Sequence, residues 1–271
     1  MVITHNINRM KVTNKLLKNE KSLLTSMKKI SSGLKINSAS DDAAGSSIST
    51  KLKAQIRGLA RAQINVQEGI HLSTEMSNSL NLISDNSLIR LRELSLKGAS
   101  DTSGTEDREA MQNEIDQILE DIDSVADGTE YNGKKLLIPP KQTIYIQSGA
   151  NAGDAFKIES FEVKVFDIGL GGINVSTRGN AVEALDKVDT AIKKVASYVG
   201  EAGSIEEGLQ YFSGKLAEYE QNLTSSNSRI EDADLAKESL DLAQRNIITQ
   251  ATQAILAQSN QSPESVMELL K

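Results

Sequence analysis

The neighbouring carboxylates Asp41 and Asp42 are the first candidates for chemistry in this sequence, because paired acids can bind a metal ion or exchange protons. Adjacent residues at the start of a helix point in different directions, however, and no further ligand lies nearby in the sequence. Acidic residues are favoured at helix N-termini, where they accept hydrogen bonds from free N–H groups and interact with the helix dipole. We therefore interpret Asp41 and Asp42 as helix-capping residues.

Other residues with catalytic potential stand alone. His5 and His71 belong to no His-Glu-x-x-His zinc motif and suggest no Ser/His/Asp set. The stretch from Gly169 to Gly172 has the glycines of a phosphate loop, but no Lys-Ser/Thr follows it, which favours a flexible turn. Cysteine is absent, which excludes disulfides, thiolate metal sites and a Cys nucleophile. The sequence predicts no enzyme, no metal site and no cofactor.

The acidic pair follows a segment whose apolar residues recur every seven positions, which predicts a helix from about residue 5 to 32. Two adjacent rows carry the pattern: Ile3, Met10, Leu17 and Leu24, and beside them Leu16, Leu23 and Ile30. Gly33 can supply the positive φ that ends a helix, and Ser38 to Asp42 offer oxygens that cap the next one. We predict a helix stop and a helix start between Ile30 and Gly45.

The middle of the chain predicts a helical hairpin and then a small β region. Apolar residues at three- and four-residue steps indicate one helix from 45 to about 97, and a second, capped at Thr105 to Asp107, that returns antiparallel to about 125. Alternating β-branched and aromatic residues predict a hairpin of strands at 143–147 and 156–165. We expect these strands to form a cap with its own local packing.

The last third predicts a helix over 180–199, a break at 200–203, and a long helix from 204 to about 258, ended by Pro263. Its apolar residues Ala233, Leu240, Ile247 and Ala254 share the seven-residue period of the first helix. The termini should therefore form an antiparallel coiled coil, with surplus apolar residues left for neighbouring subunits.

Composition agrees with a mainly α fold: a long antiparallel helical bundle or coiled coil, with a small β-hairpin cap region in the middle of the chain. Aromatic residues make up only 3% of the 271 residues, too few large rings for a compact globular core. No apolar run approaches the roughly 18 residues of a membrane span, and no secretory signal pattern is present. We expect no membrane insertion, and if the protein leaves the cell it does so by another route.

Charge is distributed unevenly, with a formal +9 on residues 1–61 and −16 on the remainder. A basic arm can bind nucleic acid or anionic lipid, but this one has no aromatic residue for base stacking. We prefer a basic helix that faces an acidic one, and no nucleic-acid partner. The acidic candidates are Glu218, Glu220, Glu231, Asp232, Asp234, Glu238 and Asp241.

Ser31-Ser32-Gly33-Leu34-Lys35-Ile36-Asn37-Ser38-Ala39, followed by Asp41-Asp42-Ala43-Ala44-Gly45, closely resembles the N-terminal signature of bacterial flagellins. Further similar motifs occur in the family's order: Gln55 to Leu59, Arg92 to Leu94, Tyr131 to Leu137, Ser228 to Asp234, Gln250-Ala251, Leu256 to Gln258 and Leu269-Leu270. The sequence departs from the family at Lys29-Ile30, where Arg-Leu is usual, at Ser40, and in 200–211, which lacks the usual Gln-Asn-Arg run.

The resemblance implies an extracellular structural subunit that self-assembles into the helical flagellar filament for motility; the alternative is a hook–filament junction protein or another minor flagellar component. It implies an N-terminal inner-core helix and spoke (1–44), a helical rod domain (45–137 and 178–228), a small β region replacing the variable outer domains (138–177) and a C-terminal inner-core helix (229–271). The terminal helices would form the inner tube. The expected assembly residues are Ile3, Ile7, Met10, Leu17, Leu24, Met27, Gly33, Ile247, Ile248, Ile255, Leu256, Leu269 and Leu270.

The same resemblance implies the partners. Besides identical subunits, these are the flagellar type III export apparatus, a secretion chaperone on the C-terminal helices, and hook-associated and cap proteins. The Toll-like receptor that detects flagellin would read positions matching Arg90, Leu94 and Glu114, all three of which are present. Ile89 departs from the Gln common in strongly detected flagellins. The alternative for these positions is contact with neighbouring protofilaments.

Overall fold

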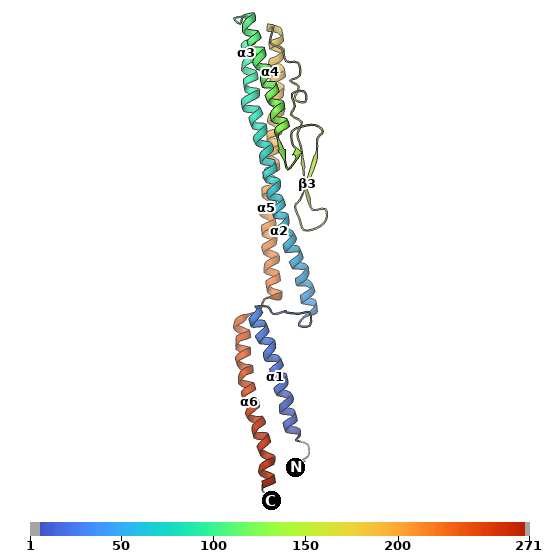
Figure 1. Ribbon diagram of the computed structural model, residues 1–271, viewed down its shortest axis with the longest axis vertical. Helices are drawn as coiled ribbons and strands as arrows, with labels where there is room; N and C mark the ends of the chain where they lie inside the picture. Colours follow the sequence, from blue (N-terminus) through green and yellow to red (C-terminus); the bar gives the residue numbers. More distant parts are fainter. Residues whose placement is uncertain (1–5, 269–271) are drawn as a thin grey trace. The chain divides into compact units, whose positions relative to one another are not determined.

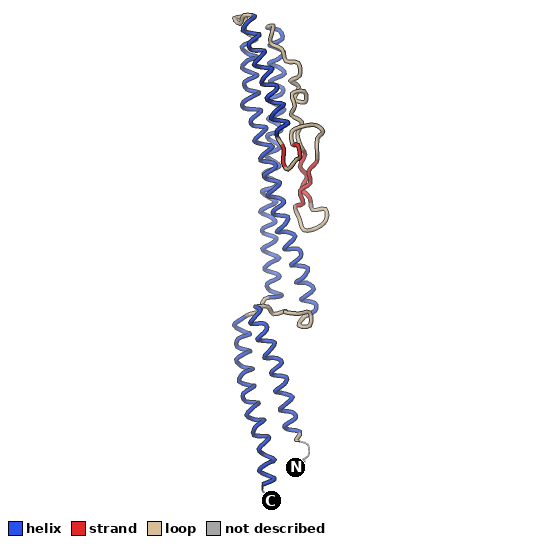
Figure 2. Tube along the Cα trace, viewed as in Figure 1, coloured by secondary structure: helices blue, strands red, loops and turns tan. Residues whose placement is uncertain are grey.

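The computed structural model describes residues 6–268, with side chains as far as Gln261, and the chain divides into two compact units. Unit 1 comprises 1–55 and 221–271, and unit 2 comprises 56–220. Helices dominate both units (Figure 2), which confirms the mainly α fold class. The helical elements are α1 (Ile7–Ser32), α2 (Ala43–Leu82), the π-helix η1 (Ile83–Leu88), α3 (Ile89–Gly98), α4 (Thr105–Gly128), α5 (Arg178–Glu231) and α6 (Leu235–Glu268).

The terminal helices α1 and α6 lie side by side within unit 1 (Figure 1). Asn6 Nδ2 donates to the Ser259 carbonyl at 3.3 Å, whereas Lys29 at the other end of α1 pairs with Glu238 at 3.2 Å. The start of α1 thus lies beside the later part of α6, and the end of α1 lies beside the start of α6. The two helices are therefore antiparallel, as predicted. Gly33 ends α1 with φ +71°, and its N–H donates to the Lys29 carbonyl at 2.8 Å.

The predicted break at 200–203 is wrong, because α5 continues through it without interruption. Each glycine inside a helix costs about 1 kcal/mol. This cost is outweighed by packing, since Ala202 is fully buried and its carbonyl accepts a 3.1 Å hydrogen bond from Ser73 Oγ of α2. Pro263 does not end the last helix either, because α6 continues to Glu268.

The real interruption lies at 232–234, in the middle of the helix predicted over 204–258. Asp234 Oδ1 accepts from the N–H groups of Ala236 and Lys237 at 3.0 and 3.1 Å, so this carboxylate caps α6. The last residue of α5, Glu231, accepts from Lys35 N–H through its carbonyl at 2.6 Å. These hydrogen bonds satisfy free backbone groups at the end of α5 and at the start of α6. A continuous helix would have paired the same groups internally.

In unit 2, α2 leads through η1 into α3, so the helix predicted over 45–97 contains a π-helical segment. The hairpin prediction is confirmed, since α4 packs on η1 and α3. Buried Arg108 of α4 donates to the carbonyls of Gly98 and Ser100, at the C-terminal end of α3. A guanidinium there satisfies free carbonyls and matches the negative end of the helix dipole.

The predicted β-hairpin is present as β3 (Thr143–Gln147) and β4 (Ala155–Glu159), paired antiparallel with Ile144 opposite Ile158. The second strand is shorter than predicted. After Glu159 the chain donates instead to the carbonyls of Leu136 and Leu137, from Phe161 and Val163. The sequence analysis missed a smaller hairpin, β1 (Glu130–Tyr131) and β2 (Lys134–Lys135), whose turn places Asn132 and Gly133 at φ +49° and +76°.

The expectation of separate local packing for this β region is wrong. Phe161 stacks on Tyr198 of α5 with ring centroids 4.9 Å apart, and Phe156 packs edge-on against Phe212 of α5 at 5.7 Å. A two-stranded hairpin buries too little surface to be stable alone, so it packs on the helix.

We expect Glu159 on β4 to remain ionised down to about pH 2. Lys141 and Lys157 donate to its two carboxylate oxygens and lower its pKa to about 2. The favourable charge interaction is therefore complete above pH about 4.5 and is lost as the pH falls through 2. Carboxyl-carbon NMR should show this titration, and Lys141→Ala should return the pKa toward its ordinary value. Titration of Glu159 together with the exposed glutamates would contradict the assignment.

Candidate subunit interface

The apolar row at Met10, Leu17 and Leu24 lies on the outside of the α1/α6 pair. These side chains are 60, 59 and 66% exposed, and the predicted assembly residues Ile7 and Met27 are 55 and 50% exposed. The neighbouring row at Leu16, Leu23 and Ile30 is half-buried instead. Only one of the two predicted rows therefore lies toward α6.

The matching row on α6 is also exposed, with Leu240 at 73% and Ile247 at 66%. Ile248 and Ile255 are 43 and 55% exposed, whereas Leu256 is half-buried. Ile3, Leu269 and Leu270, which we also expected to mediate assembly, lie outside the described residues. The expectation that the seven-residue rows of the two termini pack against each other is thus wrong, because both rows point away from the contact.

Polar residues occupy much of the contact between α1 and α6. Asn19 Nδ2 donates to the Arg245 carbonyl at 2.8 Å and to Thr249 Oγ1 at 2.7 Å, and Ser26 is buried. A polar residue at a helix–helix seam fixes register, at a cost in stability. Hydrogen bonds thus set the register of the pair, and they leave the apolar rows uncovered.

The predicted match of a basic helix with an acidic one holds only near the junction between α1 and α6. Lys29 pairs there with Glu238, whereas Glu231 pairs with Lys53 of α2 rather than with α1. Beyond Asp241, α6 carries no acidic residue until Glu264. Most lysines of α1 therefore have no acidic counterpart on α6, and the exposed apolar row lies among positive charges.

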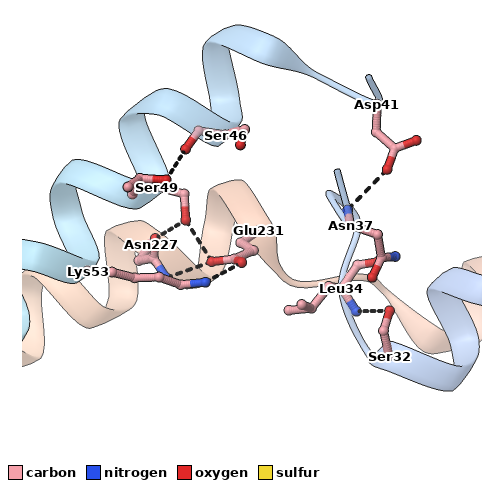
Figure 3. Close-up of polar contacts among 10 residues, drawn as sticks. Ser32, Leu34, Asn37, Asp41, Ser46, Ser49, Lys53, Asn227 and Glu231 are labelled. Atoms are coloured by element: carbon pink, nitrogen blue, oxygen red, sulfur yellow. Dashed lines mark hydrogen bonds and ion pairs between the residues drawn. The ribbon is translucent and has the colours of Figure 1, made fainter. Parts of the chain in front are cut away.

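A buried polar cluster holds the junction of unit 1 together (Figure 3). The carboxylate of Glu231, a residue only 7% exposed, accepts from Ser49 Oγ at 2.7 Å, from Asn227 Nδ2 at 3.1 Å and from Lys53 Nζ. Hydrogen bonding by Lys53 lowers the pKa of Glu231, although burial opposes the shift. This one residue joins α5 to α2 by its side chain and to Lys35 by its backbone.

Residues 33–42 continue the junction. Gly33 accepts from Ala233 N–H at 2.9 Å, and Leu34 lies opposite Asp232 in an isolated β-bridge. Asp42 Oδ1 accepts from Gly45 N–H at 2.9 Å, which confirms Asp42 as a helix cap. Asp41 does not cap the helix, because its carboxylate accepts from Asn37 N–H (Figure 3). It also accepts from Ser38 N–H, and so shapes the loop.

Sequence reasoning missed most of the buried cluster. The sequence marks Glu231 as a negative charge and as part of the motif from Ser228 to Asp234, but not as a buried acceptor, and Ser49, Lys53 and Asn227 carry no motif. Their signal was available in the spacing, since Ser49 and Lys53 are four residues apart, as are Asn227 and Glu231. Each pair therefore shares one face of its helix.

The three receptor candidates lie together in unit 2. Arg90 Nε pairs with Glu114 Oε1 at 2.7 Å across α3 and α4, and both side chains are about half exposed. Leu94, by contrast, is only 3% exposed. All three line a surface depression of about 400 Å³, together with Glu93, Lys97, Asp107, Ala110 and Met111.

The described residues contain neither a metal-ligand cluster nor a membrane-spanning helix. Among them, no three His, Asp or Glu side chains gather in positions that could hold a metal ion. Within the same part of the chain, no helix combines the length and apolar character needed to cross a membrane.

Comparison with known proteins places this architecture in a family. Residues 3–139 match the bacterial flagellin N-terminal helical region, and residues 185–270 match the bacterial flagellin C-terminal helical region. Flagellins of Halalkalibacterium halodurans and Bacillus subtilis are 36 and 34% identical to the chain, each over the full length of both sequences. The crystal structure of Bacillus cereus flagellin aligns with 56% of this chain and 88% of its own, with a TM-score of 0.51 and 26% identity. The chain belongs to the bacterial flagellins, the non-enzymatic structural subunits of the extracellular flagellar filament.

Proposed function

We propose that the α1/α6 pair forms the inner wall of the filament, where the exposed rows on both helices bury against identical subunits. The observation that carries this proposal is the exposure of Leu17, Leu24, Leu240 and Ile247, each 59% or more, at seven-residue intervals on both helices. Regular apolar rows on a soluble protein mark contact surfaces. The polar contact inside the pair fixes the register in which the rows are presented.

Each segment of the chain would then supply one part of the filament subunit. Residues 1–44 and 229–271 supply the inner-core helices and the spoke, with Gly33 at the turn, and 45–137 and 178–228 supply the rod. The short region 138–177 stands in place of the variable outer domains. Two features support this division: the helix ends at Gly33 and Glu231, and the β segment between Leu137 and Arg178.

In the double variant Leu17→Gln, Leu24→Gln, we expect the rate of seeded polymerisation to fall by more than about tenfold. Substitutions at the centre of an interface commonly have effects of this size. The monomer should keep its helical content, because both side chains are already exposed. Lys18→Gln with Thr25→Gln is the matched control, since both positions are exposed and polar on the same helix. Normal filament growth by the leucine variant would contradict the inner-wall assignment.

The remaining partners act before and after assembly. A secretion chaperone would cover the exposed row of α6 until export through the type III apparatus, and hook-associated and cap proteins would contact the ends of the polymer. The apolar exposure of Leu240 and Ile247 supports a need for such a cover before assembly. Binding of chaperone to the full chain, and its loss with Leu240→Gln and Ile247→Gln, tests this part.

The Toll-like receptor would read the monomer through the exposed Arg90–Glu114 pair. Buried Leu94 would act beneath the pair, by positioning α3 against α4. A receptor-expressing cell line that fails to respond to purified monomer would contradict this proposal.

The alternative, a hook–filament junction protein or minor component, would join or cap rather than self-polymerise. End-to-end alignment with proteins named flagellin favours the filament subunit. Electron microscopy of concentrated protein distinguishes long filaments from capped or unassembled particles.

A further inference from the structure

The tip of the β1–β2 hairpin carries the one Asn-Gly pair in the chain, Asn132-Gly133. Both residues are exposed, and both have positive φ, at +49° and +76°. An asparagine side chain closes a five-membered ring when the next backbone nitrogen attacks its amide carbon. Glycine at the next position favours this attack, because it has no Cβ to hinder the approach and adopts conformations that other residues avoid.

Four Asn-Ser pairs offer the same chemistry with a small residue after the asparagine, but the structure restrains all four. Asn78 and Asn86 lie within α2 and η1, where helical hydrogen bonds fix the backbone torsions that ring closure must change. The side-chain amides of Asn37 and Asn227 each donate to a protein oxygen at 3.1 Å, and Asn227 also lies within α5. Asn132 differs from these four because it lies outside every helix and is exposed at a turn.

The hairpin tip can open without unfolding the rest of unit 2. Ring closure needs a change of the torsion between the two turn residues, so the paired geometry must be lost for a moment. Only two residue pairs close this hairpin, and so short a ladder has little stability of its own. Directly after the hairpin, Leu136 and Leu137 are fully buried and anchor the chain. Opening is therefore confined to the tip.

We propose that Asn132 is a site of spontaneous deamidation, through a cyclic imide with Gly133. The Gly133 nitrogen loses its proton to hydroxide and attacks Asn132 Cγ. The new N–Cγ bond forms, the Cγ–Nδ2 bond breaks, and Nδ2 takes up a proton from water and leaves as ammonia. Water then opens the imide at either carbonyl, so that one water is consumed and one ammonia is released with no oxidant or reductant. Opening at Cγ gives aspartate, whereas opening at the main-chain carbonyl gives isoaspartate.

The isoaspartate product loosens the β region from this hairpin outward. Its main chain runs through the former side chain and is one carbon longer, which a two-residue turn cannot absorb while Tyr131 stays paired with Lys134. The next residues along the chain hold the β region, since the Leu136 carbonyl accepts from Phe161 N–H at 3.0 Å. Because the loss of ammonia is irreversible in water, the modified fraction grows with the age of each subunit.

Incubation of the purified, folded full chain tests the proposal, with peptide mass spectrometry to follow the change from amide to acid. The peptide with Asn132 should convert at least about tenfold faster than those with Asn37, Asn78, Asn86 and Asn227, which the fold protects. Its rate should rise by about tenfold per pH unit, because the deprotonated fraction of the attacking amide rises by that factor. An Asn132 peptide that stays unconverted in the folded chain, while the denatured chain converts it, would overturn the proposal.

Two variants connect the modification to the loosening of the β region. Asn132→Gln keeps an amide but must close a larger ring, so its aged sample should stay unmodified. Hydrogen exchange at the Phe161 amide should become several-fold faster in aged wild-type protein and should not change on ageing of Asn132→Gln. Asn37→Gln is the matched control and should age like the wild type. Equal loosening in aged Asn132→Gln would overturn the assigned effect. All these measurements use the monomer, so their failure would not bear on the inner-wall proposal.

Discussion

Glu231→Ala should lower the free energy of unfolding of unit 1 by about 2–4 kcal/mol, because it removes the acceptor shared by three donors. Ser49 is only 4% exposed, so without Glu231 its hydroxyl is left with Asn227 Oδ1, 2.8 Å away, as its acceptor rather than water. Lys53 is about half exposed and can be solvated, which keeps the loss below that of a fully buried ion pair. Native-state hydrogen exchange at the Lys35 and Ala233 amides, which donate across this junction, measures the change.

Two comparisons separate the buried cluster from ordinary surface charge. Glu231→Gln keeps an acceptor for Ser49 but not the charge, so we expect roughly half the loss seen with alanine. Glu93→Ala removes a carboxylate that bridges Arg90 at 60% exposure, and exposed pairs contribute only about 0–1 kcal/mol. Equal losses for Glu93→Ala and Glu231→Ala would show that the junction is not held by this cluster.

The pH dependence follows from the lowered pKa of Glu231. A carboxylate with a lowered folded-state pKa stabilises fully above its unfolded value, about 4.5, and loses that contribution as the pH falls through the folded value. Protection of the Lys35 amide should therefore weaken on acidification below pH 4.5 in the wild-type protein. Glu231→Gln should show a flatter dependence over the same range.

The sequence predicts helix existence well and helix interruption poorly. Periodicity located the helices around Leu17, Met76, Ile115, Val188 and Ile247, because a 3.6-residue pattern survives whatever the helix packs against. The break was placed at Gly200 and Gly203 on local propensity, but tertiary contacts through Ala202 outweigh that preference. The true break at 232–234 has only the capping carboxylate of Asp234 as a local signal, because its other partners, Gly33 and Lys35, lie about 200 residues away in the chain.

Partner choice was the other failure of sequence reasoning. The rows at Leu17 and Ile247 share a period, which suggested that they contact each other, but both rows are exposed in the structure. Period alone cannot say which of two adjacent rows faces the neighbouring helix of the same chain. Asn19 marks the side of α1 that faces α6, because its amide donates to the Arg245 carbonyl and to Thr249 Oγ1. The half-buried row at Leu16, Leu23 and Ile30 lies on this side.

Gly33→Val should abolish filament formation while leaving unit 2 folded. Gly33 has φ +71°, a conformation that costs an L-residue about 1–2 kcal/mol and a β-branched residue more. A Cβ at Gly33 meets no atom within 4 Å, so the penalty comes from the backbone alone. The valine can escape it only by leaving the left-handed region, which turns the chain away from Ala233 and breaks the bridge at Leu34.

Matched substitutions show whether the conformation at this one residue matters. Gly33→Asn should largely preserve assembly, because asparagine tolerates the left-handed region. Gly133→Val carries a similar backbone penalty at φ +76° in the β1–β2 turn of unit 2, again with open space, and should destabilise that turn without preventing assembly. Circular dichroism of the monomers and electron microscopy of seeded samples provide the two readouts. Gly33 joins α1 to a loop anchored by Glu231. Normal filaments from Gly33→Val would therefore mean that the junction tolerates a redirected chain. They would also mean that the rows on α1 reach their partners without the left-handed conformation at residue 33.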